Sequence, residues 1–149
     1  GLPFIFDIQP LDSANLKSQA LSRLGQVSHF IDTEIQNLMI GLSQGYSSPG
    51  ITVEAVPSEV RMLLESNSPF LLMGERAEDE EFNNQVKGIF DDEIAPAIRR
   101  YAQFIENKYL GQARDNISIS SNPDGSKCYP ALVRSFSTIQ PWWQSQILL

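Results

Sequence analysis

The sequence is short of the residues that carry chemistry in enzymes. Its 149 residues include one cysteine, Cys128, and one histidine, His29. A single cysteine excludes an internal disulfide but does not identify the compartment, because many exported domains also lack disulfides. Zinc sites need several convergent histidine, cysteine or carboxylate ligands, and no such spacing occurs here. The sequence therefore predicts no catalytic residue, no metal site and no cofactor.

Positive charge and long apolar runs are also scarce. Eleven Lys and Arg stand against 18 Asp and Glu, which gives a formal net charge of -7. We expect no nucleic-acid partner, because neutralising phosphates requires an excess of basic residues. No apolar run approaches the ~20 residues that a membrane-spanning helix needs. No glycine-rich phosphate loop, G-x-S-x-G elbow or H-E-x-x-H motif occurs either.

The composition is that of a folded globular protein. Hydrophobic residues make up 42% of the chain and charged residues 19%, and a chain of this length suits one domain with its own core. We expect residues 1–149 to form a single helical domain. Because the chain begins with Gly1 rather than Met, we also expect it to be a fragment, or a truncated relative, of a larger protein.

Two long stretches have apolar residues at the three-and-four spacing of one helix face. They cover about residues 14–44 and 79–110, and the second has acidic residues at its start and basic residues later, which suits the helix dipole. Pro96 lies inside the second stretch, so either one helix is kinked there or two helices meet. The apolar stripe continues in phase across Pro96, which favours a kinked helix. We expect an all-α bundle in which these two long helices pack antiparallel.

Two shorter helices complete this interpretation. The first runs from Thr52 or Val53 to about Glu65, although Pro57 indicates either a start near Val56 or a kink. The second covers residues 126–137, after a strong turn signal at Asn-Pro-Asp-Gly, and should turn Tyr129, Leu132, Val133 and Phe136 inward.

The remaining segments are connections and ends. Residues 1–11 contain two prolines and are expected to form an extended arm lying on the helices. Residues 67–74 read as a connection whose apolar residues, Phe70 to Met73, tuck under the helices. Residues 141–149 are an apolar tail. The tail offers a candidate partner surface formed by Trp142, Trp143, Ile147 and Leu148, but it is equally compatible with packing on this domain or with the cut edge of a longer protein.

The other candidate residues have simpler explanations. His29 lies off the apolar face of its helix and is expected on the surface. Cys128 is expected to fill a gap in the core or a partly exposed pocket. The acidic group at residues 75–81 lacks the alternating ligands of a calcium loop and is explained by charge at a helix start. The basic residues after Ile98 are expected to be a solvated helix end.

Three groups of residues, in order, resemble one known family. Residues 20–24, 30–32 and 41–50 look like its first helix and glycine–proline turn. Residues 94–100 and Phe104 look like its long helix, which ends in a Y-L-x-x-A-R signature here formed by Tyr109, Leu110, Ala113 and Arg114. Residues 123–125, Tyr129, 131–132 and 136–138 look like the stretch that follows. From Leu11 to about Gln140 the chain thus resembles the amino-terminal part of the domain of unknown function 885 family.

That resemblance implies a bacterial protein that is often exported, periplasmic or lipid-anchored. Members usually carry an H-E-x-x-P-G-H-type motif in a later half, which places them near the helical zinc metallopeptidases, and this chain stops before any such motif. The resemblance therefore implies a non-catalytic helical region that forms a cleft or braces a catalytic half. Its partner would be that missing carboxy-terminal half or a second copy of the chain. The alternative is a self-standing helical interaction module, and the compartment stays undetermined.

Overall fold

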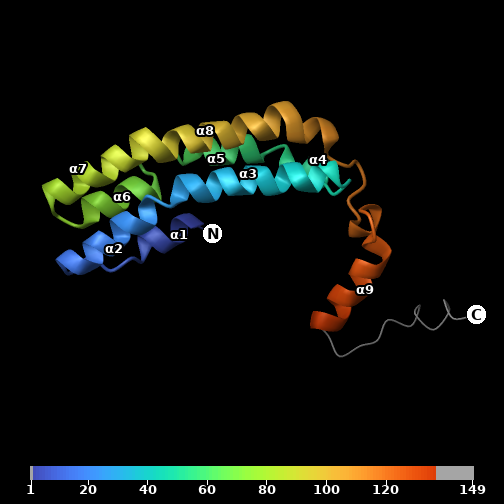
Figure 1. Ribbon diagram of the computed structural model, residues 1–149, viewed down its shortest axis with the longest axis horizontal. Helices are drawn as coiled ribbons and strands as arrows, with labels where there is room; N and C mark the ends of the chain where they lie inside the picture. Colours follow the sequence, from blue (N-terminus) through green and yellow to red (C-terminus); the bar gives the residue numbers. More distant parts are fainter. Residues whose placement is uncertain (1, 137–149) are drawn as a thin grey trace, which may run out of the picture.

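In the computed structural model, which describes residues 2–136, the chain is built from helices joined by short turns (Figure 1). No strand occurs within this range, where the only sheet-like pairing is an isolated bridge between Pro49 and Arg114. The all-α class predicted from the sequence is confirmed. The α-helices are α1 (Leu2–Asp7), α2 (Ala14–Leu24), α3 (Val27–Ser43), α4 (Gly50–Val53), α5 (Val56–Met62), α6 (Pro69–Arg76), α7 (Glu80–Ile89), α8 (Ala95–Phe104) and α9 (Gly125–Phe136).

The first long stretch is divided into α2 and α3 at Gly25, where the sequence predicted an unbroken helix. The Gln26 N–H donates to the carbonyl of Arg23, an i→i−3 bond that tightens the chain for one turn. Gly25 is one of two glycines in this stretch, and a glycine inside a helix costs about 1 kcal/mol relative to alanine. The turn lets α2 pack against α7 while α3 packs against α8.

The second long stretch follows one helical path from α7 through α8. Between them, Phe90–Ile94 form a π-helical turn in which the Ala95 N–H donates to the Phe90 carbonyl. Pro96 is the second residue after this turn, and the wider turn accommodates a ring that an α-helix interior would exclude. Figure 1 shows the path bending here, as the in-phase apolar stripe predicted. A second π turn (Ile105–Tyr109) and a 3₁₀ turn (Leu110–Gln112) end it.

The extended arm that the prolines of residues 1–11 suggested is not found in the described part of this segment, because Leu2–Asp7 form α1. The ring of Phe6 is buried edge-on against Phe70 of α6, with 5.2 Å between centroids. Arg76 of α6 donates to the carbonyls of Phe6 and Gln9 at 3.0 and 2.8 Å, and it also contacts the Asp7 carbonyl. These bonds satisfy carbonyls at the end of α1 that a short helix leaves free.

The segment expected to be a connection at residues 67–74 contains α6 instead. Pro69 occupies its first turn, where a missing N–H costs nothing. Phe70 and Met73 are buried as predicted, whereas Leu72 is exposed. The helix α5 begins at Val56 with Pro57 in its first turn, so the sequence alternative of a late start is the correct one.

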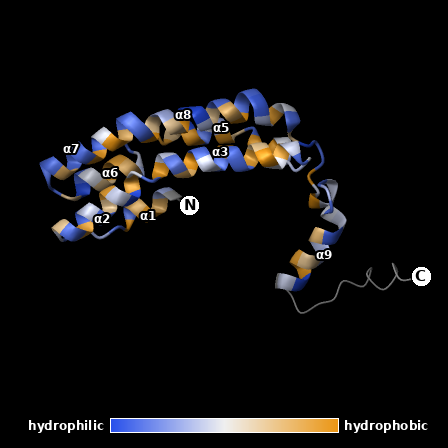
Figure 2. Cartoon of the chain, in the orientation of Figure 1, coloured by the Kyte–Doolittle hydropathy of each residue, from blue (hydrophilic) through white to orange (hydrophobic). Residues whose placement is uncertain are grey.

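The core consists of two clusters of buried side chains. The larger one joins α1, α2, the start of α3, α6, α7 and the start of α8, and the smaller one joins α4 to the end of the second long stretch. Figure 2 shows hydrophilic residues along the outer edge of α7 and α8 and hydrophobic residues on the side that faces the other helices. An ion pair from Arg100 of α8 to Asp32 of α3, at 2.8 Å, spans the two long stretches. Their predicted packing against each other is confirmed.

Candidate functional site

The partner surface predicted on the tail lies outside the described residues. This applies to Trp142, Trp143, Ile147 and Leu148, so their role stays a prediction. The part of the chain nearest to that tail within the structure is α9, and it becomes the candidate site.

Helix α9 points away from the bundle formed by α1 to α8 (Figure 1). It packs on a 3₁₀ turn at Ile119–Ser121 rather than along the bundle. Tyr129 is 49% exposed and Leu132 is 41% exposed, so the prediction that they face inward is wrong. Cys128 is exposed on the same helix, which also corrects the expected core position. We call the exposed side chains of Cys128, Tyr129 and Leu132 the α9 surface.

The start of α9 is fixed by a tight backbone turn. Asp124 has a φ of 55°, in the left-handed region that favours short polar residues and glycine. Its carbonyl accepts the N–H groups of Lys127 and Cys128 at 2.9 and 3.1 Å. A Cβ added at Gly125 would lie 2.2 Å from the carbonyl oxygen of Ile119. Only glycine therefore allows this approach, and the turn predicted at Asn-Pro-Asp-Gly is confirmed.

Four residues hold together the place where the chain leaves the bundle, and we call Ser47, Ser48, Tyr109 and Arg114 the clasp. The Ser48 N–H donates to the buried Tyr109 hydroxyl at 2.9 Å. The Arg114 side chain donates from Nε to the Ser47 carbonyl at 2.8 Å, and its backbone N–H donates to Ser48. These bonds join the turn after α3 to the end of the second long stretch. They set the direction in which the chain continues toward α9.

The clasp changes the interpretation of one residue. Arg114 was expected to be part of a solvated helix end, but it is half-buried and donates three side-chain hydrogen bonds to carbonyls of Ser47, Asn116 and Ser118. Charge counting missed this role. The signal that could have found it is the Y-L-x-x-A-R resemblance, since both Tyr109 and Arg114 belong to it and both bind the same turn.

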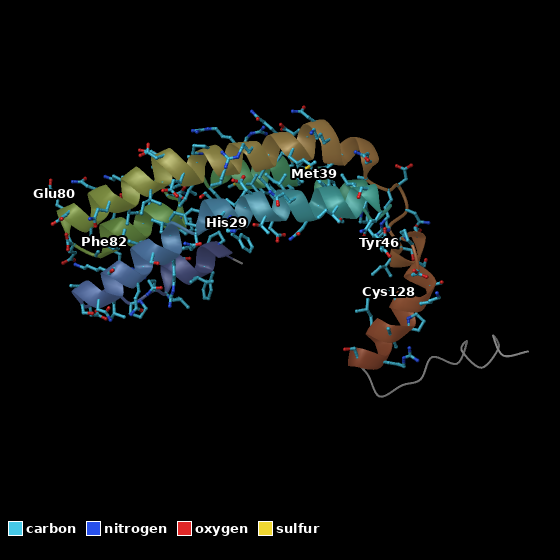
Figure 3. The ribbon with its side chains drawn as sticks, viewed as in Figure 1. His29, Met39, Tyr46, Glu80, Phe82 and Cys128 are labelled. Atoms are coloured by element: carbon cyan, nitrogen blue, oxygen red, sulfur yellow. The ribbon has the colours of Figure 1, made fainter. Side chains whose placement is uncertain are left out.

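His29 and Cys128 are not brought together. Figure 3 shows His29 near the start of α3 and Cys128 on the projecting α9. His29 is exposed, as predicted. Across the described part of the chain, no group of three or more His, Cys, Asp or Glu side chains is placed to hold a metal ion.

The acidic residues at the start of α7 act as helix-end charge. The Asp79 carboxylate is the N-cap and accepts the Phe82 N–H at 3.0 Å. It also binds Lys17 of α2 at 2.7 Å. The Lys17 hydrogen bond and the backbone bond from Phe82 lower the pKa of Asp79 below its ordinary value. Within residues 2–136, no helix has the length and apolarity to cross a bilayer.

The fold and site define an all-α helical region with a projecting amphipathic helix. A family model described as "Bacterial protein of unknown function (DUF885)" matches residues 1–141. The chain therefore belongs to that bacterial family, as the resemblance predicted, while the metallopeptidase-like description of the family stays a prediction. Comparison with curated proteins found no match, and comparison with solved structures found none either.

Proposed function

We propose that this chain is the non-catalytic helical region of a DUF885 protein and that it supports a catalytic unit through the α9 surface. The observation that carries the proposal is the position of α9, a helix that stands away from its own bundle and on which Cys128 and Leu132 are exposed. Membership of the family supports the bacterial helical assignment. The supporting and cleft-forming role is our inference.

The spacing on α9 suits docking into a groove of another protein. The exposed residues Cys128 and Leu132 stand at i and i+4, a spacing by which amphipathic helices place docking side chains on one face. Full burial of one such side chain contributes about 1.5–3 kcal/mol. The clasp and the Gly125 turn hold α9 in one direction, and a pre-ordered element loses less entropy on binding than a flexible one.

Two ion pairs on the surface of the bundle join helices that are distant in sequence. Arg100 and Asp32 form a two-pronged ion pair between α8 and α3, with distances of 2.8–3.1 Å. Arg61 of α5 forms a similar pair with Glu106 of the second π turn. In this proposal the long helices form one wall of a substrate cleft, or brace the unit that contains it, and contribute no reactive group.

Incubating the pure chain with zinc and a peptide library tests the non-catalytic part of the proposal. We expect no stoichiometric zinc binding in equilibrium dialysis and no zinc-dependent cleavage by mass spectrometry, because no metal-ligand spacing occurs in the sequence. A known zinc peptidase under the same conditions serves as the positive control. Stoichiometric zinc or zinc-dependent cleavage by this chain would refute the proposal.

The second candidate is a self-standing helical interaction module, and the partner tested first is a second copy of the chain. This module is favoured by the exposed apolar residues Phe4 and Ile8 near α1 and Phe30 and Ile40 on α3. Sedimentation velocity separates the two candidates: a concentration-dependent dimer that Phe30→Asp disperses supports the module. A monomer at all concentrations supports a region whose partner is a different protein unit.

A further inference from the structure

A hollow of about 270 Å³ lies between α3, α5 and α8, at a site separate from the α9 surface. Its lining is almost entirely apolar, and the buried ring of Phe70 contributes to it from α6. The volume exceeds the roughly 150 Å³ of a cavity that holds benzene. It falls just short of the roughly 300 Å³ at which drug-sized ligands begin to fit. The space therefore suits a single ring or a short chain.

The polar character of this hollow comes from two side chains. Glu34 of α3 is half-buried in the lining, and Tyr101 of α8 stands beside it. Burial raises the pKa of the Tyr101 hydroxyl, and the nearby Glu34 carboxylate raises it further. Among the described residues, the ion pairs of Lys and Arg go to other carboxylates and leave Glu34 without one. The Glu34 carboxylate is therefore available to pair with a cation that enters the hollow.

Aromatic side chains complete the chemistry that a cation requires. Phe30, Phe70 and Tyr101 all line the hollow. Aromatic faces attract organic cations, and several around one site form the cages that recognise alkylated ammonium groups. We propose that the hollow binds a small organic ammonium ion with an apolar body of about one ring. Its charged group would lie against Glu34 and its body against the apolar lining.

Three probes of similar shape and different charge test this site on the full chain. They are 2-phenylethylammonium, the neutral 2-phenylethanol and the anionic 3-phenylpropanoate, each titrated by calorimetry at pH 7. We expect saturable binding of the ammonium ion, weaker binding of the alcohol and none of the carboxylate. Glu34→Gln should lower the affinity for the ammonium ion about fivefold, which is the effect expected of a partly exposed ion pair. It should leave the affinity for the alcohol unchanged.

Two further variants separate the site from general effects. Glu80→Gln makes the same chemical change at an exposed position at the start of α7 (Figure 3) and should leave all three affinities unchanged. Val60→Phe adds a ring to the lining and should abolish binding of both the ammonium ion and the alcohol, with helicity checked by circular dichroism. Equal affinity for the ammonium ion and the alcohol, or no binding of the ammonium ion, would overturn the proposal. Dissociation of a dimer by Val60→Phe would also overturn the proposal, because the hollow would then be covered by a second copy of the chain.

Discussion

Gly74 lies where α6 and α7 approach each other closely. A Cβ at this position would stand 2.6 Å from Oδ1 of Asn83 and 3.2 Å from two side-chain atoms of Val86. Val86 is fully buried, so it has no free space into which it can move. The absence of a side chain at Gly74 is therefore what permits this helix contact.

Replacing this glycine should reverse the usual helix preference for alanine. We expect Gly74→Ala to lower the free energy of unfolding by about 1–3 kcal/mol, the usual cost of overpacking. The matched control is Gly88→Ala on α7, where an added Cβ has nothing within 4 Å. That change should raise the free energy of unfolding by up to about 1 kcal/mol. Urea denaturation measures the free energy of unfolding of both variants. Changes of the same sign and size in the two would contradict the packing argument.

Tyr109 of the clasp is a second residue whose contribution to stability can be measured, because its hydroxyl accepts one defined hydrogen bond. Tyr109→Phe removes the acceptor of the Ser48 N–H and should cost about 1 kcal/mol of unfolding free energy. Tyr46→Phe is the control, because Tyr46 is exposed on the turn beside the clasp (Figure 3). Denaturant midpoints measure both changes. A loss as large in Tyr46→Phe as in Tyr109→Phe would show that the clasp bond does not stabilise the turn.

Among the helices, α2 and α7 are joined by a contact that depends on pH. Lys17 of α2 binds the Asp79 carboxylate, which also caps α7. The pKa of Asp79 is lowered in the folded chain, so its ionised form favours folding. This contribution is present above the unfolded pKa of about 3.9 and is lost as the pH falls through the lower folded value. Glu106, whose pKa Arg61 lowers, acts in the same direction.

The variant Asp79→Asn should isolate this contribution. Asparagine keeps a side-chain oxygen at the N-cap but cannot titrate, so the decline in stability below about pH 4 should become shallower. At pH 7 the variant should be less stable than the wild type. Urea unfolding at pH 7 and pH 3 measures both effects. Asp91→Asn, at an exposed carboxylate of the π turn, should keep the wild-type slope, and an unchanged slope in Asp79→Asn would refute the assignment.

The all-α class and the buried faces of the long helices could be predicted from the sequence, because apolar spacing indicates which side of a helix is buried. That spacing runs unbroken from Phe82 to Tyr109, and Phe82, Val86 and Tyr109 are all buried. The ends of helices were harder to predict. Residues 2–7 are helical because of Phe70 and Arg76, about 70 positions away, and no local pattern reveals such partners.

The candidate site was less predictable than the fold. The same spacing rule that worked for the bundle turned Tyr129 and Leu132 inward, yet both are exposed. An amphipathic pattern shows that a helix has an apolar face but does not say which molecule covers it. The hollow was missed for a related reason, because Glu34, Val60 and Tyr101 come from three helices that only the fold brings together.

At the scale of the whole molecule, residues 2–136 form a bundle, α1 to α8, and one helix, α9, that points away from it. The two buried clusters lie within the bundle and include no residue of α9. The clasp and Gly125 determine where α9 points. In the proposed function, the bundle braces the catalytic unit and the α9 surface contacts it.

The reactivity of Cys128 tests that account most directly, because it is the chain's single cysteine and lies on the α9 surface. Its rate of reaction with a thiol reagent is measured in the isolated chain and in the longer protein that the proposed function requires, in which the chain is joined to its catalytic unit. Glu80→Cys in a Cys128→Ser background provides a reporter thiol at the far end of the bundle. The account predicts that Cys128 reacts freely in the isolated chain and at least about tenfold more slowly in the longer protein, a protection of about 1.4 kcal/mol, while the reporter thiol on α7 stays equally reactive in both. Equal reactivity of Cys128 in the two would contradict it.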